Sequence, residues 1–250
     1  VLCAMRRAAR SVGGATWLSR RPQLRQFDNV LNEDDCGRLR RLTSSRMAAC
    51  DLSEAAHAAS HERSSTGCWL PRHDAPPLAW KALGATERDV ALVARLETWL
   101  AEACGLPPTH GEPPQVLRYR PGQQYDLHPD FFDPRDRGSL ANGGQRVLTC
   151  LIYLSTVPAH AGGATFFPRA TDEASGERGL RVQPVAGRAI VLRNAADDGK
   201  VDVRSVHAGE PLRRVVDNSS AAGGRPVEKW LVTKWVRRRP FLVDTAAFEA

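Results

Sequence analysis

The sequence predicts a mainly β protein of the α+β class, in which a double-stranded β-helix (a jelly-roll, cupin-like barrel) is buttressed by N-terminal helices. Helical patterns are confined to the first part of the chain, and from Gln115 onward short apolar runs alternate with Gly, Pro and Asp turns. Helices followed by a series of short strands indicate a barrel or sandwich with its helices on one side. No internal repeat or linker divides the 250 residues. We therefore expect a loose arm over 1–15 and one domain over 16–250, with helical support in 16–110 and the barrel core in 111–240.

The first predicted elements are an extended opening segment and a helix. Leu18–Asn32 reads as extended, with Pro22 at an edge, where a missing N–H does least harm. Asn32 is followed by three acidic residues, which is typical of a helix start because a capping side chain and negative charge stabilise the first turn. This helix is expected to end near Ala48. The segment Ala49–Pro77 has no clear period and predicts a long loop with at most one strand.

A second helix is predicted to begin at Thr86. Thr86-Glu87-Arg88-Asp89 resembles a capping box with Asp in place of the usual Glu or Gln. An apolar stripe at helical spacing follows, formed by Leu92, Val93, Leu96, Trp99 and Leu100. Gly105 then supplies a helix stop.

The barrel strands are predicted from seven short runs bounded by turn residues. They are Val116–Tyr119, Arg146–Leu154, Ala164–Phe167, Leu180–Pro184, Arg188–Leu192, Val203–His207 and Lys229–Val236.

Composition narrows the class of protein. Apolar residues make up 42% and charged residues 25%, which is ordinary for a globular protein, and no apolar stretch is long enough to cross a membrane. The formal charge of +7 comes from dispersed basic residues. The densest cluster, Arg237–Arg239, lacks interleaved aromatic residues, which argues against nucleic-acid binding.

The six cysteines are scattered, without a C-x-x-C pair or zinc-finger spacing. We expect Cys36, Cys104 and Cys150 to be buried free thiols. If the protein is secretory, one disulfide among Cys36, Cys50 and Cys68 is the alternative. The sequence leaves the compartment open between the endoplasmic reticulum or secretory lumen and the cytoplasm, and it leaves the oligomeric state open.

A candidate metal site is centred on His128 and Asp130. On an extended segment, residues i and i+2 point to the same face, so this imidazole and carboxylate can converge. Together with a distant histidine, His207, they would form the 2-His-1-carboxylate set of non-haem Fe(II) oxygenases. The same ligands also suit zinc, but a zinc hydrolase needs a general-base Glu, and no motif places one. The remaining histidines lie in loops and are expected at the surface: His57, His61, His73, His110 and His160.

Six motifs in order strengthen this interpretation. They are Y-R-P-G-Q-Q-Y-D-L-H-P-D (Tyr119–Asp130), T-C-L-I-Y-L (Thr149–Leu154), G-G-A-T-F-F-P (Gly162–Pro168), P-V-A-G-R-A (Pro184–Ala189), H-A-G-E-P (His207–Pro211) and K-W (Lys229–Trp230) with a later Trp235. From about Leu18 to its end, the chain resembles the prolyl 4-hydroxylase family of 2-oxoglutarate- and Fe(II)-dependent dioxygenases.

The resemblance implies a reaction and its cofactors. His128, Asp130 and His207 would be both the catalytic residues and the Fe(II) ligands. 2-Oxoglutarate would be oxidatively decarboxylated to succinate and CO2 while an unactivated C–H is hydroxylated, and L-ascorbate would re-reduce the iron. The implied substrate is peptidyl-proline in a Pro-rich or collagen-like peptide or protein.

The resemblance also assigns the residues around the co-substrate. A buried carboxylate needs a cation or several donors, and Lys229 matches the family's lysine. Tyr119, Tyr153 and Thr149 are expected to line the same pocket. Tyr125 is expected nearer the peptide substrate.

Departures from the family pattern leave alternatives open. Residues 213–226 lengthen the spacing between His207 and Lys229, and they predict a hairpin extension between two barrel strands. If the alignment is shifted there, Lys234 would replace Lys229. Ala164 stands where an acid is usual, and Ala49–Pro77 matches the family only in R-S-S-T-G.

These departures leave other functions open. The same oxygenase chemistry could act on another protein side chain, a free amino acid or an alkylated base, although no aromatic base clamp or basic groove is evident. A non-catalytic metal-binding barrel is the remaining class, but the three ligand positions and the lysine are all filled.

Overall fold

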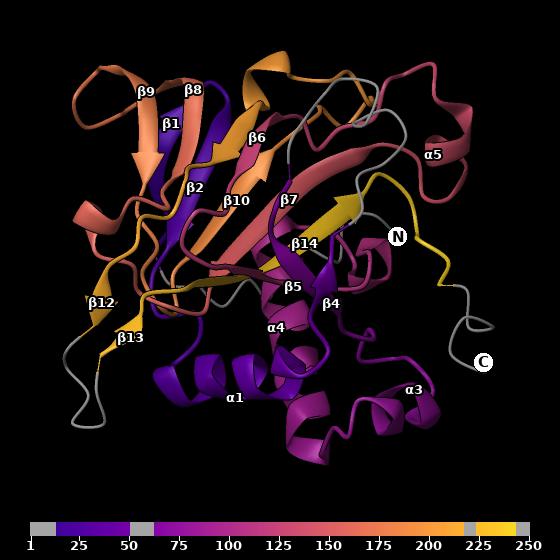
Figure 1. The fold of residues 1–250 in the computed structure, drawn as a ribbon. Helices are drawn as coiled ribbons and strands as arrows, with labels where there is room; N and C mark the ends of the chain where they lie inside the picture. Colours follow the sequence, from indigo (N-terminus) through magenta and orange to yellow (C-terminus); the bar gives the residue numbers. More distant parts are fainter. Residues whose placement is uncertain (1–13, 51–62, 218–223, 244–250) are drawn as a thin grey trace.

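The structure is a computed structural model that describes residues 14–50, 63–217 and 224–243, and its strands form two main sheets (Figure 1). The strands of the large sheet are β1 (Thr16–Arg20), β2 (Gln23–Phe27), β3 (Ala48–Ala49), β4 (Thr66–Trp69), β5 (Gln115–Tyr119), β7 (Arg146–Tyr153), β10 (Ala189–Arg193) and β14 (Lys229–Arg237). Those of the small sheet are β6 (Tyr125–His128), β8 (Thr165–Thr171), β9 (Arg178–Val182) and β11 (His207–Gly209). The strand order is β1-β2-β10-β7-β14-β5-β4-β3 in the large sheet and β6-β11-β8-β9 in the small sheet.

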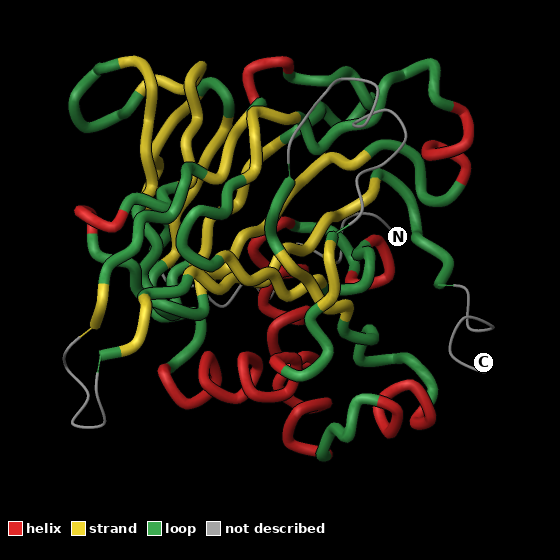
Figure 2. The backbone as a smooth tube through the Cα atoms, viewed as in Figure 1, coloured by secondary structure: helices red, strands yellow, loops and turns green. Residues whose placement is uncertain are grey.

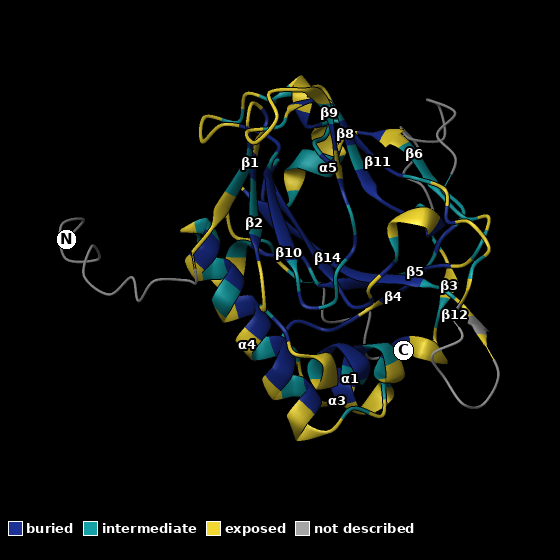
Figure 3. Cartoon of the chain, turned by 90° about the vertical axis from the view of Figure 1, so that its left-hand side faces the viewer, coloured by how far each residue is buried: buried dark blue, intermediate teal, exposed yellow. Residues whose placement is uncertain are grey.

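The α-helices are α1 (Glu33–Ser44), α3 (Pro77–Ala82), α4 (Glu87–Cys104) and α5 (Arg137–Ala141), and the 3-10 helices are η1 (Pro108–His110), η2 (Ala159–Ala161) and η3 (Val203–Ser205). The helices α1, α3 and α4 lie together on one side of this barrel, whereas α5 and other short helical segments lie at its other edges, as Figure 1 and Figure 2 show. In Figure 3, α1, α3 and α4 cover the outer face of the large sheet, and their buried sides face its strands. The predicted jelly-roll barrel buttressed by helices is confirmed. Within the described residues, no helix is long and apolar enough to span a membrane.

Two large cores lie on the two faces of the large sheet, because strand side chains alternate between these faces. Along β14, Trp230 and Val232 join the core beneath the helices, whereas Leu231 joins the core inside the barrel. The inner core also contains Phe167 and Leu180 of the small sheet, so both sheets close over the same interior. Successive residues of one strand therefore serve different layers.

Both predicted long helices form with their predicted starts. The Asn32 side chain accepts a hydrogen bond from the Asp35 N–H at 2.8 Å. The Thr86 N–H donates to the Asp89 carboxylate at 2.7 Å, so Asp performs the capping-box role. Gly105 ends α4 with φ 69°, a left-handed conformation that favours glycine.

Several elements differ from the expectation. The opening segment is a hairpin, β1 with β2, that turns at Pro22, and β2 pairs with β10 inside the large sheet. The range 16–110 thus contributes four strands as well as helices. The predicted strand Val203–His207 is η3 followed by β11, because the Asp202 carboxylate accepts from the Arg204 N–H and turns the chain. α3 and α5 were not predicted.

Two of the three cysteines expected to be buried free thiols are so. Cys36 and Cys150 are free and buried, whereas Cys104 is free but only partly buried. Desolvation raises the pKa of Cys36 to about 11 and that of Cys104 to about 12. Cys36 and Cys68 are both free, so the disulfide alternative does not occur between them. Cys3 lies outside the described residues.

The P-V-A-G-R-A turn has a steric basis at Gly187. Its φ is +80°, and an added Cβ would lie 2.1 Å from the Leu31 carbonyl oxygen. The Gly187 carbonyl also accepts from the Val30 N–H at 2.8 Å. This close contact fixes the segment before α1 against the start of β10.

We expect Gly187→Ala to lower the free energy of unfolding by about 2 kcal/mol or more, since strain in φ adds to a backbone collision. Gly84→Ala is the matched control: φ there is +67°, and nothing lies within 4 Å of an added Cβ. Its loss should be nearer about 1 kcal/mol. Urea unfolding followed by tryptophan fluorescence measures both. Equal losses would show that the Leu31 contact is not limiting.

Candidate metal site

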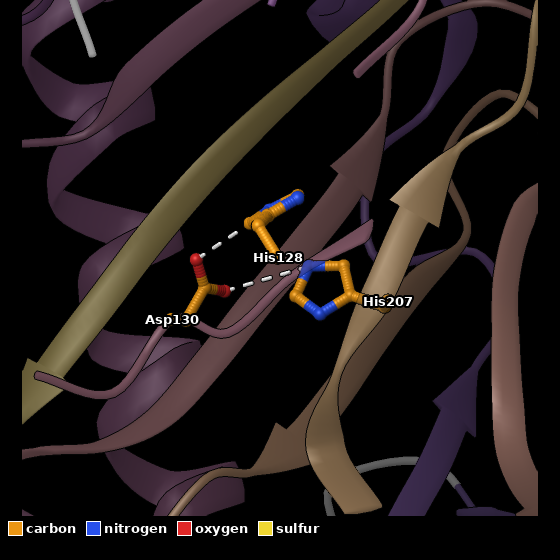
Figure 4. Close-up of side chains that lie close together, drawn as sticks. All are labelled: His128, Asp130 and His207. Atoms are coloured by element: carbon orange, nitrogen blue, oxygen red, sulfur yellow. Dashed lines mark ion pairs between the residues drawn. The ribbon is translucent and has the colours of Figure 1, made fainter. Parts of the chain in front are cut away.

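Strand pairing brings the two predicted histidines together. His207 opens β11 and lies directly opposite His128, which ends β6, in an antiparallel pair. Asp130 follows two residues after His128, and its carboxylate oxygens lie 3.9 Å from His128 Nε2 and 3.6 Å from His207 Nε2. Figure 4 shows the three side chains pointing toward one another. All three are buried, and their potential ligand atoms lie within 4.8 Å of one another.

Hydrogen bonds orient both imidazoles. His128 Nδ1 lies 2.7 Å from the Asp126 carbonyl oxygen, and His207 Nδ1 lies 3.0 Å from the Ser205 carbonyl oxygen. A carbonyl only accepts, so each Nδ1 carries the hydrogen and each Nε2 keeps its lone pair. The lone pairs are the ligand positions of neutral histidine. The ring of Tyr125 stacks on His128 with centroids 3.5 Å apart, which limits rotation of that imidazole.

The charge states suit a divalent cation. Burial, reinforced by the neighbouring His207, lowers the pKa of His128, so this imidazole is neutral. Burial alone would raise the pKa of Asp130, but His207, His128 and Arg146 outweigh it and keep the carboxyl ionised. Two imidazoles and one carboxylate are the donor set of the non-haem iron facial triad. Within the described ranges, this is the group of three ligand-type residues that could hold a metal.

A chain of hydrogen bonds reaches Asp130 from behind. Thr149 Oγ1 donates to Asp130 Oδ2 at 2.6 Å, and Asn194 Nδ2 donates to Thr149 Oγ1 at 2.7 Å. Thr149 was expected to line a co-substrate pocket, but its hydroxyl is engaged with Asp130 and it does not line the cavity described next. Asn194 was missed, because an asparagine after a strand carries no local signal of such a role.

A cavity of about 1410 Å³ opens over the three ligands. Its buried wall includes Tyr119, Leu151, Thr165, Leu231 and Lys229, and also Trp235. Its less buried part includes Arg63, Trp69, Tyr125, Phe132 and Arg146. Tyr125 therefore lies at the cavity, whereas Tyr153 is fully buried and its hydroxyl donates to Thr165 Oγ1 at 2.7 Å. Of these two neighbours, Thr165 is the one that reaches the cavity wall.

Lys229 brings a positive charge into the barrel. Its side chain is buried, and Lys229 pairs with Tyr119 across β14 and β5. Burial lowers the pKa of Lys229 to about 7, with Glu210 opposing the shift. No carboxylate of the described residues forms an ion pair with it, and its Nζ lies 5.2 Å from the Tyr119 ring centroid. A buried ammonium without a counter-charge is costly, so the cavity is suited to an anionic ligand.

Lys234 lies on the opposite face of β14. It forms a buried ion pair with Glu97 of α4, and His73 contacts the other carboxylate oxygen. Lys229 and Lys234 are five positions apart, an odd number, so alternation places them on different faces of the sheet. The alternative anchor at Lys234 is therefore excluded.

The other histidines and the insertion complete the comparison with the expectations. His160 is exposed, but His73 contacts buried Glu97, and His110 Nδ1 lies 3.1 Å from the Arg237 carbonyl oxygen. His73 and His110 are thus partly exposed and each has a polar partner, while His57 and His61 lie outside the described residues. The insertion forms the expected hairpin from β12 (Val216–Asp217) and β13 (Arg225–Pro226), and 218–223 are not described.

Comparison with known proteins agrees with this geometry. The family model of the 2OG-Fe(II) oxygenase superfamily matches residues 114–237. Prolyl 4-hydroxylase 2 of Arabidopsis thaliana is 30% identical over 235 residues, covering 88% of this chain and 68% of that relative. Probable prolyl 4-hydroxylase 3 of the same plant is 31% identical over 233 residues, covering 88% and 70%.

Solved structures share the fold. A viral collagen prolyl hydroxylase from Paramecium Bursaria Chlorella virus-1, solved as a 2OG complex, superposes with a TM-score of 0.56 at 22% identity, covering 86% of this chain and 95% of that one. A Pseudomonas putida prolyl-4-hydroxylase gives a TM-score of 0.52 at 21% identity, covering 86% and 92%. The solved structures thus show a shared fold, and the sequence relatives show that the chain belongs to the prolyl 4-hydroxylase family of 2-oxoglutarate- and Fe(II)-dependent oxygenases.

Proposed function

We propose that this chain hydroxylates peptidyl-proline, using Fe(II) and 2-oxoglutarate. One observation carries the proposal: His128, Asp130 and His207 converge at the same cavity that contains the unpaired, buried Lys229. The three ligands suit a metal ion, and the buried ammonium of Lys229 suits a carboxylate of a dicarboxylate that also binds this metal. The family relatives named above, which are prolyl 4-hydroxylases, support the same assignment.

Each residue has a definite task in this proposal. His128, Asp130 and His207 hold the metal through Nε2, a carboxylate oxygen and Nε2. Lys229 binds the far carboxylate of 2-oxoglutarate, and Tyr119, its cross-strand neighbour, lines the same wall. When bound, the iron supplies oxidative decarboxylation of 2-oxoglutarate to succinate and CO2, coupled to C–H hydroxylation. The apolar wall around Lys229 excludes water from the co-substrate, and ascorbate is the proposed reductant for iron oxidised in uncoupled turnovers.

The exposed part of the cavity supports a Pro-rich peptide as the substrate. Trp69 and Trp235 lie with ring centroids 6.0 Å apart, and Trp69 is 50% exposed. The Arg146 guanidinium lies 3.9 Å from the Trp235 ring and 4.7 Å from the Phe132 ring. Aromatic-lined grooves with nearby hydrogen-bond donors suit Pro-rich segments, whose extended helix is preformed and exposes its carbonyls.

Peptide-dependent turnover tests the proposal. The chain is incubated with Fe(II), ascorbate, 2-oxoglutarate and either a Pro-rich or a collagen-like peptide, and succinate and hydroxyproline are measured. Matched peptides with alanine in place of proline are the control. We expect succinate and hydroxyproline in equal amounts with the proline peptides alone. Succinate without hydroxyproline for every proline peptide would overturn the prolyl assignment and leave the oxygenase.

Lys229 predicts a pH dependence of co-substrate binding. Its pKa is about 7 when buried, against 10.5 ordinarily. Between these values the unfolded chain binds more protons than the folded chain, so the free energy of unfolding of the ligand-free protein rises with pH there. A bound carboxylate favours the ammonium and raises its pKa. Binding of 2-oxoglutarate at pH 8 should therefore take up about one proton, and its affinity should fall as pH rises from 7 to 9.

Calorimetric titration in buffers of different ionisation enthalpy measures this proton uptake. The control is Lys229→Arg, because a guanidinium stays charged throughout this range. The variant should bind with little uptake and little pH dependence. Zero uptake by the wild-type chain would mean that Lys229 is already charged before binding, or is not the anchor.

A further inference from the structure

Two hydrogen bonds connect Asn194 to Asp130 through Thr149. The Thr149 hydroxyl has one proton, and it donates that proton to Asp130 Oδ2 at 2.6 Å. Thr149 Oγ1 in turn accepts from Nδ2 of Asn194, 2.7 Å away. The Asn194 amide is therefore turned with its nitrogen toward Thr149 and its oxygen away from it.

This orientation leaves an unsatisfied group. Asn194 is fully buried, and its Oδ1 has no hydrogen-bond partner among the described residues. The backbone of Asn194 is held on both sides, because its N–H donates to Val147 O and its carbonyl accepts from the Asp202 N–H, each at 2.8 Å. These two hydrogen bonds fix the backbone from which the Asn194 side chain projects. A buried acceptor without a partner destabilises a fold, so a position that retains one is a candidate for a functional role.

We infer that Asn194 is a positioning residue of the metal site, acting through Thr149 to fix the Asp130 carboxylate in its ligating orientation. The inference rests on the proposed function, because it assumes that the three ligands hold a metal. Among the described residues, Asn194 forms no hydrogen bond with any of the three ligands. Its amide donates to the Thr149 hydroxyl and orients it, and the hydroxyl donates to Asp130 Oδ2. The unpaired Asn194 carbonyl lowers the stability of the fold, while the Asn194 amide, through Thr149, orders the metal ligand Asp130.

The test compares metal affinity with the stability of the metal-free protein. Asn194→Leu removes the amide donor and the unpaired carbonyl while keeping a side chain of similar size. Cobalt(II) alone is titrated into the EDTA-treated and desalted chain and followed by its visible absorption. Urea unfolding of the same metal-free sample gives stability. We expect Asn194→Leu to bind Co(II) about 10–100-fold more weakly, the usual effect of losing an outer hydrogen-bond partner of a metal ligand.

The metal-free stability should move the other way or stay constant, because the unpaired carbonyl is gone. Thr149→Val should lose a similar factor in affinity, and adding Asn194→Leu to it should cause no further loss, since both act along one path. Thr149→Ser keeps the hydroxyl and should bind Co(II) as the wild type does. Trp80→Phe is the matched control: it removes another unpaired buried polar atom, on α3, and should leave Co(II) affinity unchanged.

The outcomes separate the two proposals. A wild-type chain that does not bind Co(II) would overturn the proposed function and this inference with it. Normal Co(II) affinity in Asn194→Leu would overturn the inference alone, as would reduced stability with unchanged affinity, which indicates a merely structural role. If leucine is not accommodated, Asn194→Ala provides the same comparison.

Discussion

His207→Ala is expected to stop 2-oxoglutarate turnover and to weaken Co(II) or Fe(II) binding by at least about 1000-fold, because losing even an outer partner of a ligand costs about 10–100-fold. Among the described residues, no fourth side chain of a ligand type joins this group. The imidazole lies opposite His128 in the β6–β11 pair, and its Nε2 is one of three converging ligand atoms. Removing it leaves only His128 and Asp130, which come from one short segment.

Metal titration and succinate release together test this expectation. His160→Ala is the matched control, since His160 lies exposed in η2 and does not line the cavity. The control should behave as the wild type in both measurements. Near-normal Co(II) affinity in His207→Ala would rule out the proposed metal site, and lost turnover with retained affinity would give His207 a role other than metal ligation.

Lys229→Met is expected to weaken 2-oxoglutarate binding by about 2–5 kcal/mol, the usual result of removing one partner of a buried charge pair. The ligand carboxylate would then enter an apolar barrel wall without a counter-charge. The ligand-free protein should become more stable at the same time, because the variant removes a buried ammonium that has no ion-pair partner among the described residues. Affinity and stability thus move in opposite directions.

Calorimetric titration of 2-oxoglutarate at pH 7, with Co(II) present, measures the affinity, and urea unfolding measures the stability. Lys200→Met is the control, since Lys200 is exposed and outside the cavity. Unchanged 2-oxoglutarate affinity in Lys229→Met would remove Lys229 as the anchor. A lower free energy of unfolding for the ligand-free variant would show that a protein group stabilises the buried Lys229 ammonium.

Local signals predicted the two long helices, α1 and α4, well. The caps at Asn32 and Thr86 and the stop at Gly105 act within one helical turn, so the sequence around each of them contains the whole interaction. The strand order could not be predicted, because it depends on contacts between distant segments. The opening hairpin is an example: β2 is part of the large sheet only because β10 pairs with it.

The metal ligands were predictable because the motifs place them, but the surrounding side chains were predicted less well. Thr149, Leu151 and Tyr153 share one face of β7 by alternation, so the pattern assigns all three to the barrel interior. Their positions along the strand give them different neighbours: Thr149 contacts Asp130, and Tyr153 contacts Thr165. These neighbours come from distant segments that meet only in the closed barrel, so no local pattern specifies them. The parity of β14 places Lys229 and Lys234 on opposite faces of the sheet. Which lysine faces the cavity became clear only from the structure, where Lys234 pairs with Glu97 and Lys229 lines the cavity.

The direct pairing of His128 with His207 links metal uptake to the order in which the chain matures. β6 and β11 are separated in sequence by most of the barrel, and such long-range pairing forms slowly because the intervening chain must first be ordered. Before β11 docks, a newly made chain presents only the His128–Asp130 half of the cluster. We therefore expect the proposed metal to bind only after β11 has docked. A chain whose folding stops before that step should remain an apoprotein.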